Sequence, residues 1–140
     1  MLKNINPLLT GSLLSILADM GHGDDLVIVD ANYPAQASGV HVLDFPGISA
    51  TAMAEAVLSV LPLDDFVDMP AAVMQAPNET PAIYGEFEEV IAVAEGRKIA
   101  VDPVERFAFY ARATEAFAVI RTGERRLYGN IIFKKGVIRS

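Results

Sequence analysis

The sequence predicts a single α/β domain, residues 1–140, in which a central, mostly parallel sheet is flanked by helices. Two observations lead to this prediction. Short apolar runs alternate along the chain with segments of helical spacing, and 140 residues suit one domain. The runs DLVIV (25–29) and AAVMQ (71–75) also lack polar alternation, which is typical of strands covered on both faces of a layered sheet.

Each element has its own local signal. Helices are expected at 12–20, 50–61, 81–96 and 105–115, and strands at 25–29, 40–44, 71–75, 98–101, 117–121 and 130–136. Ser49 suits the N-cap of the second helix, and Thr80 with Pro81 suits the start of the third. Since only the turn-rich segment TGERRLYG separates the last two strands, we expect them to lie antiparallel or at an edge of the sheet.

The composition excludes several classes of function. The net charge of −7 would repel a polyanion, so a nucleic-acid partner is not expected. No apolar run reaches the roughly 18 residues of a membrane span, and we read the N-terminal apolar segment as structure rather than as a signal peptide. The chain has no cysteine, which fits a cytoplasmic location and removes thiolate chemistry. The hydrophobic content of 52% points to association with further copies of the chain.

Few motifs of known chemistry are present. No GxGxxG, P-loop or GxSxG pattern occurs, and no cluster of His, Asp and Glu has the spacing of a metal site. We therefore expect neither a cofactor nor a metal. His41 lies in an expected strand and is read as a structural or surface residue.

The stretch MGHGDDLVIVDANYPA holds the first candidate site residues. His22 stands between two glycines, which would let a ligand come close, and an imidazole can exchange a proton near neutral pH. The alternative is a histidine that only hydrogen-bonds the end of the preceding helix. Asp30 follows a strand, at the place where ligands of α/β sheets bind, and a carboxylate there can accept hydrogen bonds from the adjacent hydroxyls of a polyol. The alternative is a loop acid that caps backbone groups.

The positions of these two residues create a geometric difficulty. His22 precedes the strand and Asp30 follows it, and five strand residues span roughly 17 Å. Both cannot touch one sugar-sized ligand if they flank a straight strand. Either the loop around His22 folds back, or the site combines groups from two chains.

The C-terminal third supplies further candidates. Arg106 and Tyr110 lie on an expected helix, where an aromatic residue more often serves packing. Tyr128, Gly129 and Asn130 precede the last strand and offer a phenol, accessible backbone and an amide, although an ordinary tight turn has the same composition.

Taken together, these stretches resemble the L-fucose mutarotase family, which belongs with D-ribose pyranase to the RbsD/FucU group. The resemblance covers residues 1 to about 138 and rests on GHGD, DAxxPA, RFAFYxRA, TGE and YGNIxxKKGV. It implies an RbsD-like layered fold and an isomerase that interconverts sugar anomers without cofactor or metal. It also implies ring-like homo-oligomers, often decamers, with sites between neighbouring subunits.

The resemblance implies a role for each matching residue. His22 matches the proton donor, and the substrate-binding positions match Asp30, Arg106, Tyr128, Gly129 and Asn130. Asn32 replaces the histidine of fucose-type relatives, which leaves the sugar open, whereas Arg106 favours the fucose branch. The expected function is anomer exchange of L-fucose or a related pyranose by acid–base ring opening. The alternative is a monosaccharide-binding module without catalysis, linked to sugar transport or regulation.

Overall fold

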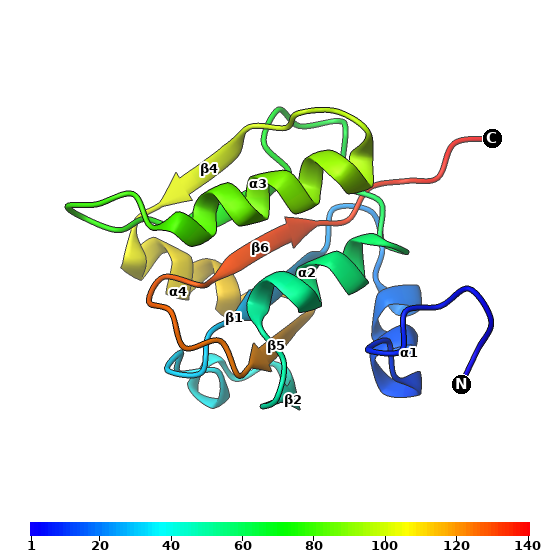
Figure 1. Ribbon diagram of the computed structural model, residues 1–140, viewed down its shortest axis with the longest axis horizontal. Coiled ribbons are helices and arrows are strands. Elements are labelled where there is room, and N and C mark those ends of the chain that lie inside the picture. The colour runs from blue at the N-terminus through cyan, green and yellow to red at the C-terminus, as the bar shows by residue number, and fades with distance from the viewer.

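A computed structural model describes all 140 residues as one sheet with helices on both faces (Figure 1). The elements are, in chain order, α1 (Gly11–Asp19), β1 (Asp25–Val29), the 3₁₀-helix η1 (Gln36–Ser38), β2 (His41–Phe45), α2 (Ala50–Leu58), β3 (Ala71–Met74), α3 (Ala82–Glu95), β4 (Val101–Val104), α4 (Arg106–Thr114), β5 (Ala118–Thr122) and β6 (Ile131–Lys134). The prediction of a single α/β fold with a mostly parallel sheet is confirmed.

The six strands lie in the order β2-β5-β1-β6-β3-β4. Strands β1 to β5 all run in one direction, and β6 alone runs against its neighbours β1 and β3. Strands β5 and β6 therefore run in opposite directions, which confirms the antiparallel alternative, although β1 separates them. The edge alternative is wrong for β6, because it lies inside the sheet. The reversal brings the start of β6 to the same edge of the sheet as the ends of β1 and β3.

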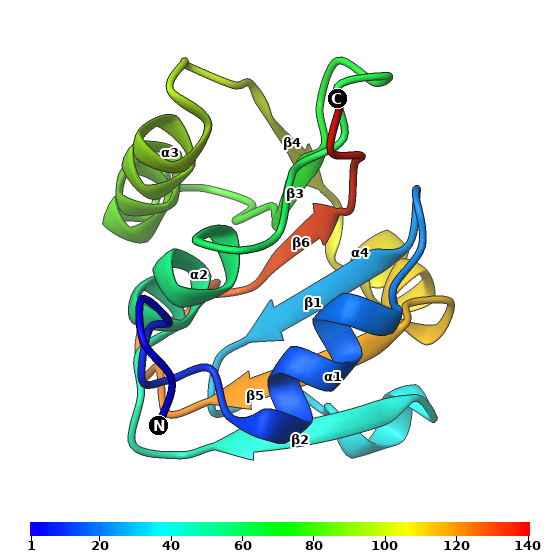
Figure 2. The ribbon, with the colours of Figure 1, turned by 90° about the vertical axis from the view of Figure 1, so that its right-hand side faces the viewer.

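The side chains of each strand point alternately into two hydrophobic cores. Leu26 and Ile28 of β1 face the larger core beneath α1, α2 and α3, whereas Val27 and Val29 face the smaller core beneath α4. Figures 1 and 2 show the two helical layers on opposite faces of the sheet. The strands are thus covered on both sides, which explains their uninterrupted apolar runs.

The capping and hydrophobicity signals in the sequence predicted the ends of some helices and strands correctly and misplaced others. The Ser49 hydroxyl accepts a hydrogen bond from Ala52 N at 3.2 Å, so the expected N-cap of α2 is present. Helix α3 begins one residue later than expected, with Pro81 at its N-cap. Strand β4 lies three residues beyond the expected 98–101, because pairing with β3 decides its position. It contains Pro103, which an edge strand tolerates.

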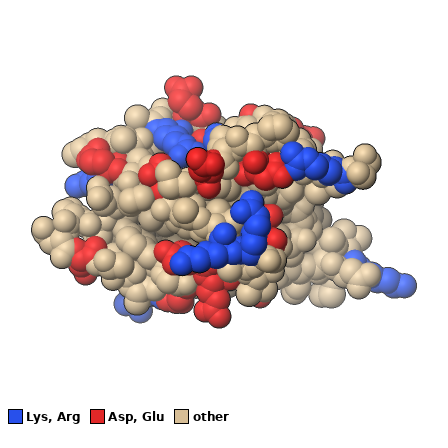
Figure 3. Space-filling view, turned by 90° about the horizontal axis from the view of Figure 1, so that it is seen from above, with Lys and Arg blue, Asp and Glu red and all other residues tan.

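The surface carries charges of both signs. On the face in Figure 3, lysine and arginine side chains lie among aspartates and glutamates, so no continuous basic surface forms there. His41 is exposed on β2, as expected. None of the helices is both long and apolar enough to cross a membrane.

Candidate active site

A cavity of about 190 Å³ opens at the edge of the sheet where β1 and β3 end and β6 begins. It is lined by Asp30, Asn32, Tyr33, Met74, Arg106, Tyr110, Leu127, Tyr128 and Asn130. The loops after β1 and before β6 meet here because β6 is antiparallel to β1. The structure therefore brings together four of the predicted site residues, namely Asp30, Arg106, Tyr128 and Asn130, with Gly129 between the last two.

Asp30 is held in this cavity by backbone groups. Its side chain is buried, and Oδ1 accepts a hydrogen bond from Asn32 N at 2.9 Å. Burial raises the pKa of the carboxyl group above its usual value, although nearby backbone amides, including those of Asn32 and Gly129, oppose the rise. Both readings from the sequence are present, since Asp30 caps its loop and also lines the cavity.

Asn130 and Tyr128 approach Asp30 from the other loop. Asn130 Oδ1 accepts a hydrogen bond from Asp30 N at 2.8 Å, so its amide nitrogen is turned toward Met74 Sδ at 3.8 Å. Tyr128 has a φ of 61°, a left-handed conformation that is rare for a bulky residue. Such conformations persist where surrounding contacts impose them, and they cluster at ligand sites.

Aromatic residues form the remaining wall. Arg106 Nε donates to the Tyr110 hydroxyl at 3.1 Å, and the Tyr110 ring lies 5.3 Å from that of Tyr33. The guanidinium carbon of Arg106 stands 5.5 Å from the centre of the Tyr110 ring, within reach of a cation–π contact. Burial raises the pKa of the Tyr33 phenol, so this group remains a hydrogen-bond donor. An arginine and aromatic rings that meet edge to face offer hydrogen-bond donors and an apolar surface to a polyhydroxylated ring.

His22 lies away from the cavity, at the opposite end of β1. Its Nε2 is 3.0 Å from Asp64 Oδ1, and its ring centre is 4.9 Å from that of Phe66. The His22 side chain is 43% exposed, whereas the Asp64 side chain is 4% exposed. The loop does not fold back, so one chain does not unite His22 with the other predicted site residues.

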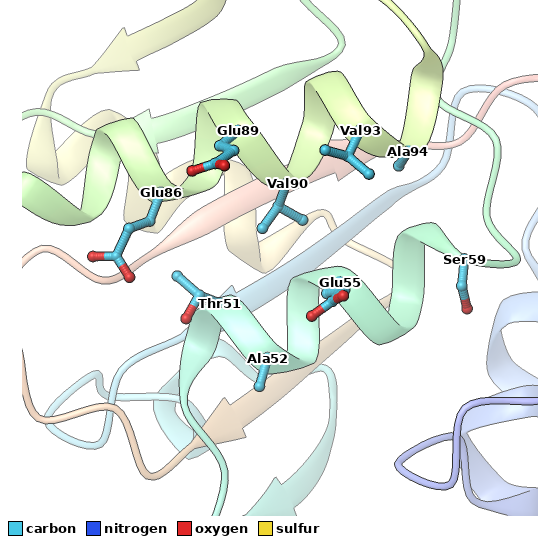
Figure 4. A pocket seen from close by; sticks show the side chains of 9 residues that line it. All are labelled: Thr51, Ala52, Glu55, Ser59, Glu86, Glu89, Val90, Val93 and Ala94. Atoms are coloured by element: carbon cyan, nitrogen blue, oxygen red, sulfur yellow. The ribbon is translucent and has the colours of Figure 1, made fainter.

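A second, larger hollow holds no such set of groups. It measures about 570 Å³ and lies between α2 and α3, with Glu55, Glu86 and Glu89 among its lining side chains (Figure 4). None of the predicted site residues lines it. The structure also contains no group of three or more His, Cys, Asp or Glu side chains that could hold a metal ion.

Comparison with known proteins identifies the family and agrees with the fold. Residues 3–138 match the model of the RbsD / FucU transport protein family. The chain belongs to the RbsD / FucU family. It is 44% identical over 140 residues to a protein named L-fucose mutarotase from Actinobacillus pleuropneumoniae serotype 5b, covering 98% of this chain and 97% of that protein. It is also 44% identical over 147 residues to the fucose mutarotase of Homo sapiens, covering 98% and 94%.

A solved structure of an RbsD / FucU relative has the same architecture. The fucose mutarotase of Streptococcus pneumoniae, solved in complex with L-fucose, is 34% identical to this chain with a TM-score of 0.93. The match covers 99% of this chain and 100% of that chain. The resemblance seen in the sequence is thereby confirmed, and with it the assignment to an isomerase family whose curated members include L-fucose mutarotases.

Some residues of the site were not found from the sequence. Tyr33, Met74 and Leu127 line the cavity, and Asp64 holds His22. Met74 is the last residue of β3 and stands one residue before the end of the predicted strand 71–75, so the rule that singled out Asp30 points to this place as well. Asp64 carried no signal, since 42 residues separate it from His22 and only the fold brings the two together.

Proposed function

We propose that this protein is a mutarotase that interconverts the α and β anomers of a free monosaccharide, with L-fucose or a related pyranose as its substrate. The observation that carries the proposal is the single cavity shared by Asp30, Arg106, Tyr128 and Asn130. Its carboxylate, guanidinium, phenol and amide groups are the partners that sugar hydroxyls need. The names of relatives that are 44% identical support fucose as the sugar.

The chemistry requires only the movement of protons. A pyranose changes anomer when the bond between C1 and the ring oxygen breaks, C1 rotates about the C1–C2 bond, and the ring closes again. Opening needs a proton delivered to the ring oxygen and a proton removed from the anomeric hydroxyl. A positioned acid–base pair supplies about 10²–10⁴-fold in rate, which is a useful gain for a reaction that already proceeds in water.

Each site residue then has a role. His22 carries the proton to and from the sugar oxygen, while Asp30 and Arg106 hold hydroxyls. Tyr128 and Asn130 position the anomeric end, and either Asp30 or a water molecule takes the second proton. The pairing of His22 Nε2 with Asp64 leaves Nδ1 as the nitrogen that is free to meet the sugar.

A second copy of the chain must deliver His22 to the cavity. Exposed apolar side chains at both places support this step: Phe107 and Leu127 beside the cavity are 68% and 65% exposed, and Phe66 beside His22 is 65% exposed. Clusters of exposed apolar side chains mark association surfaces, and Val67 and Met69, which follow Phe66 in the chain, are each 42% exposed as well. A closed ring of copies, such as each layer of a decamer, would place every His22 at a neighbour's cavity.

Exchange NMR on free sugars tests the function directly. One anomeric signal of L-fucose is saturated, and transfer to the other anomer is measured with and without protein; D-ribose and D-glucose serve as comparison sugars. We expect transfer to accelerate for L-fucose and His22→Ala to abolish the acceleration. Binding without any change in transfer would instead indicate a sugar-binding module, and an active His22→Ala variant would refute the role of His22.

The cytoplasm remains the expected location. The chain has no cysteine, so its stability does not depend on an oxidising compartment. Fractionation of cells that produce the protein at its natural level tests this expectation.

A further inference from the structure

Glu124 is a buried carboxylate that is not part of the cavity lining. Its side chain is 5% exposed, and it receives four hydrogen bonds from neighbouring groups. Arg126 binds both carboxylate oxygens, Nε to Oε1 at 3.0 Å and Nη2 to Oε2 at 3.1 Å. Arg126 N also donates to Oε1, and Ala50 N at the start of α2 donates to Oε2 at 3.3 Å. Glu124 thus ties its own loop to a helix of the core.

The loop that begins at Glu124 is fastened to the Asp30 loop at two points. The Glu124 carbonyl accepts from Ala31 N at 2.9 Å, and the Asn130 side chain accepts from Asp30 N at 2.8 Å. Residues 125–129, which lie between these two attachment points, therefore form a bridge across the edge of the sheet. Tyr128 projects into the cavity from this bridge.

The Glu124 side chain also limits how close the bridge backbone can lie to the core. A Cβ atom on Gly129 would lie only 2.8 Å from Glu124 Cγ and 3.2 Å from Ile83 Cδ1, so the backbone at Gly129 packs directly against both side chains. The preceding residue is Tyr128, whose left-handed φ of 61° is unfavourable for a bulky side chain and must be imposed by its surroundings. Glu124 supplies contacts on both sides of this strained residue, through Arg126 and through Gly129.

We propose that Glu124 is a positioning residue of the sugar site, which holds Tyr128 and Asn130 at their places opposite Asp30. The inference rests on the proposed function for the identity of the ligand. Glu124 does not touch the sugar and transfers no proton. Substitution of Glu124 should therefore raise the Kd for the sugar, whereas substitution of His22 should lower kcat.

Glu124→Gln and Glu86→Gln form a matched pair for the test. Both carboxylates bind the Arg126 side chain, but Glu86 is 45% exposed and reaches the bridge through that side chain alone. Glu124 is 5% exposed, also accepts from Arg126 N, and packs against Gly129. Exposed pairs contribute little, so Glu86→Gln should behave as wild type. Three of the four tyrosines line the cavity and the chain has no tryptophan, so the near-UV tyrosine spectrum reports on the site.

The oligomer of each variant is titrated with L-fucose by tyrosine fluorescence, and anomer exchange gives KM and kcat. We expect Glu124→Gln to raise Kd and KM by about tenfold, to change the near-UV spectrum of the sugar-free protein, and to lower kcat by less than His22→Ala does. Glu86→Gln should stay within about twofold of wild type in every readout. Arg126→Gln removes the guanidinium that binds the Glu124 carboxylate, and it should raise the Kd for L-fucose severalfold. This variant replaces Glu124→Gln in the test if Glu124→Gln does not fold.

The proposal is overturned if the folded Glu124→Gln or Arg126→Gln variant keeps both the wild-type Kd and the wild-type near-UV spectrum. These two readouts do not depend on catalysis. A wild-type protein that binds L-fucose without accelerating exchange would refute the mutarotase function, and the Kd of Glu124→Gln would still decide the positioning role. A wild-type protein that binds no sugar refutes both proposals.

Discussion

His22 and Asp30 lie at opposite ends of β1, with Asp25–Val29 between them. His22 is held by Asp64 at one end, and Asp30 lines the cavity at the other. A five-residue strand separates its ends by about 17 Å, which exceeds the reach of a monosaccharide. If one sugar contacts both residue types, its site must combine His22 of one chain with Asp30 of another. Each chain then contributes its His22 to one site and its Asp30 to a second site.

This separation predicts that two inactive variants restore each other. His22→Ala and Asp30→Asn should each lose most anomer exchange, but mixed oligomers from co-expression should regain activity. In a random equal mixture, about a quarter of the sites would combine an intact His22 with an intact Asp30 from a neighbour. Exchange NMR on the purified mixture, with each variant alone as the control, measures the recovery. A co-expressed mixture as inactive as its parents would contradict the shared site.

Gly129→Ala should disturb the site for a steric reason. The added Cβ would lie 2.8 Å from Glu124 Cγ and 3.2 Å from Ile83 Cδ1, so the loop must shift. Overpacking of this kind costs about 1–3 kcal/mol of stability, and displacement of Tyr128 should raise the Kd for L-fucose. Gly85→Ala is the matched control, since a Cβ at that exposed position of α3 meets nothing within 4 Å. It should leave binding unchanged and slightly raise stability; equal behaviour of the two variants would argue against the steric account.

Asp25 should make stability depend on pH in the acid range. Burial tends to raise the pKa of its carboxyl group, but hydrogen bonds from Arg112 and Lys134 outweigh burial, so the pKa is lowered. A lowered folded-state pKa contributes stability that is present above the unfolded value of 3.8 and is lost as pH falls through the folded value. Asp25→Asn should cost about 1–3 kcal/mol at pH 7, and the difference from wild type should shrink below about pH 4.

Urea unfolding between pH 3 and pH 7 measures this difference. Asp44→Asn is the control, because Asp44 and Arg121 form a more exposed pair, worth about 0–1 kcal/mol. A cost of Asp25→Asn that stays constant over the whole range would contradict the assigned shift.

Asp30→Asn should stabilise the protein while it weakens binding. Because burial raises the pKa of Asp30, its stabilising contribution is complete below 3.8 and is lost as pH rises through the folded value. The variant should thus show a higher thermal midpoint at pH 7 and a Kd for L-fucose raised at least about tenfold. Wild-type affinity should fall as pH is lowered through the raised pKa, whereas the affinity of the variant should stay flat. A less stable variant at pH 7 would show that the carboxylate is not an unfavourable charge.

Several elements of the fold could be read directly from the sequence. The run DLVIV forms β1 at the expected residues, and Ser49 caps α2, because apolar runs and caps are short-range signals. Strand β4 was misplaced because its position depends on pairing with β3, which lies 30 residues earlier in the chain. The interior place of β6 likewise depends on two distant partners rather than on its own residues.

The sequence by itself determined the class of fold, the family and the chemical groups available for a site, since these depend on local pattern and motif. Only the tertiary structure decided which groups meet. It placed Asp30 and Asn130 in hydrogen-bond contact across 100 residues of chain, and it paired His22 with Asp64 at the other end of the sheet. Strand direction and order set these distances, and both follow from packing between segments that are remote in the sequence.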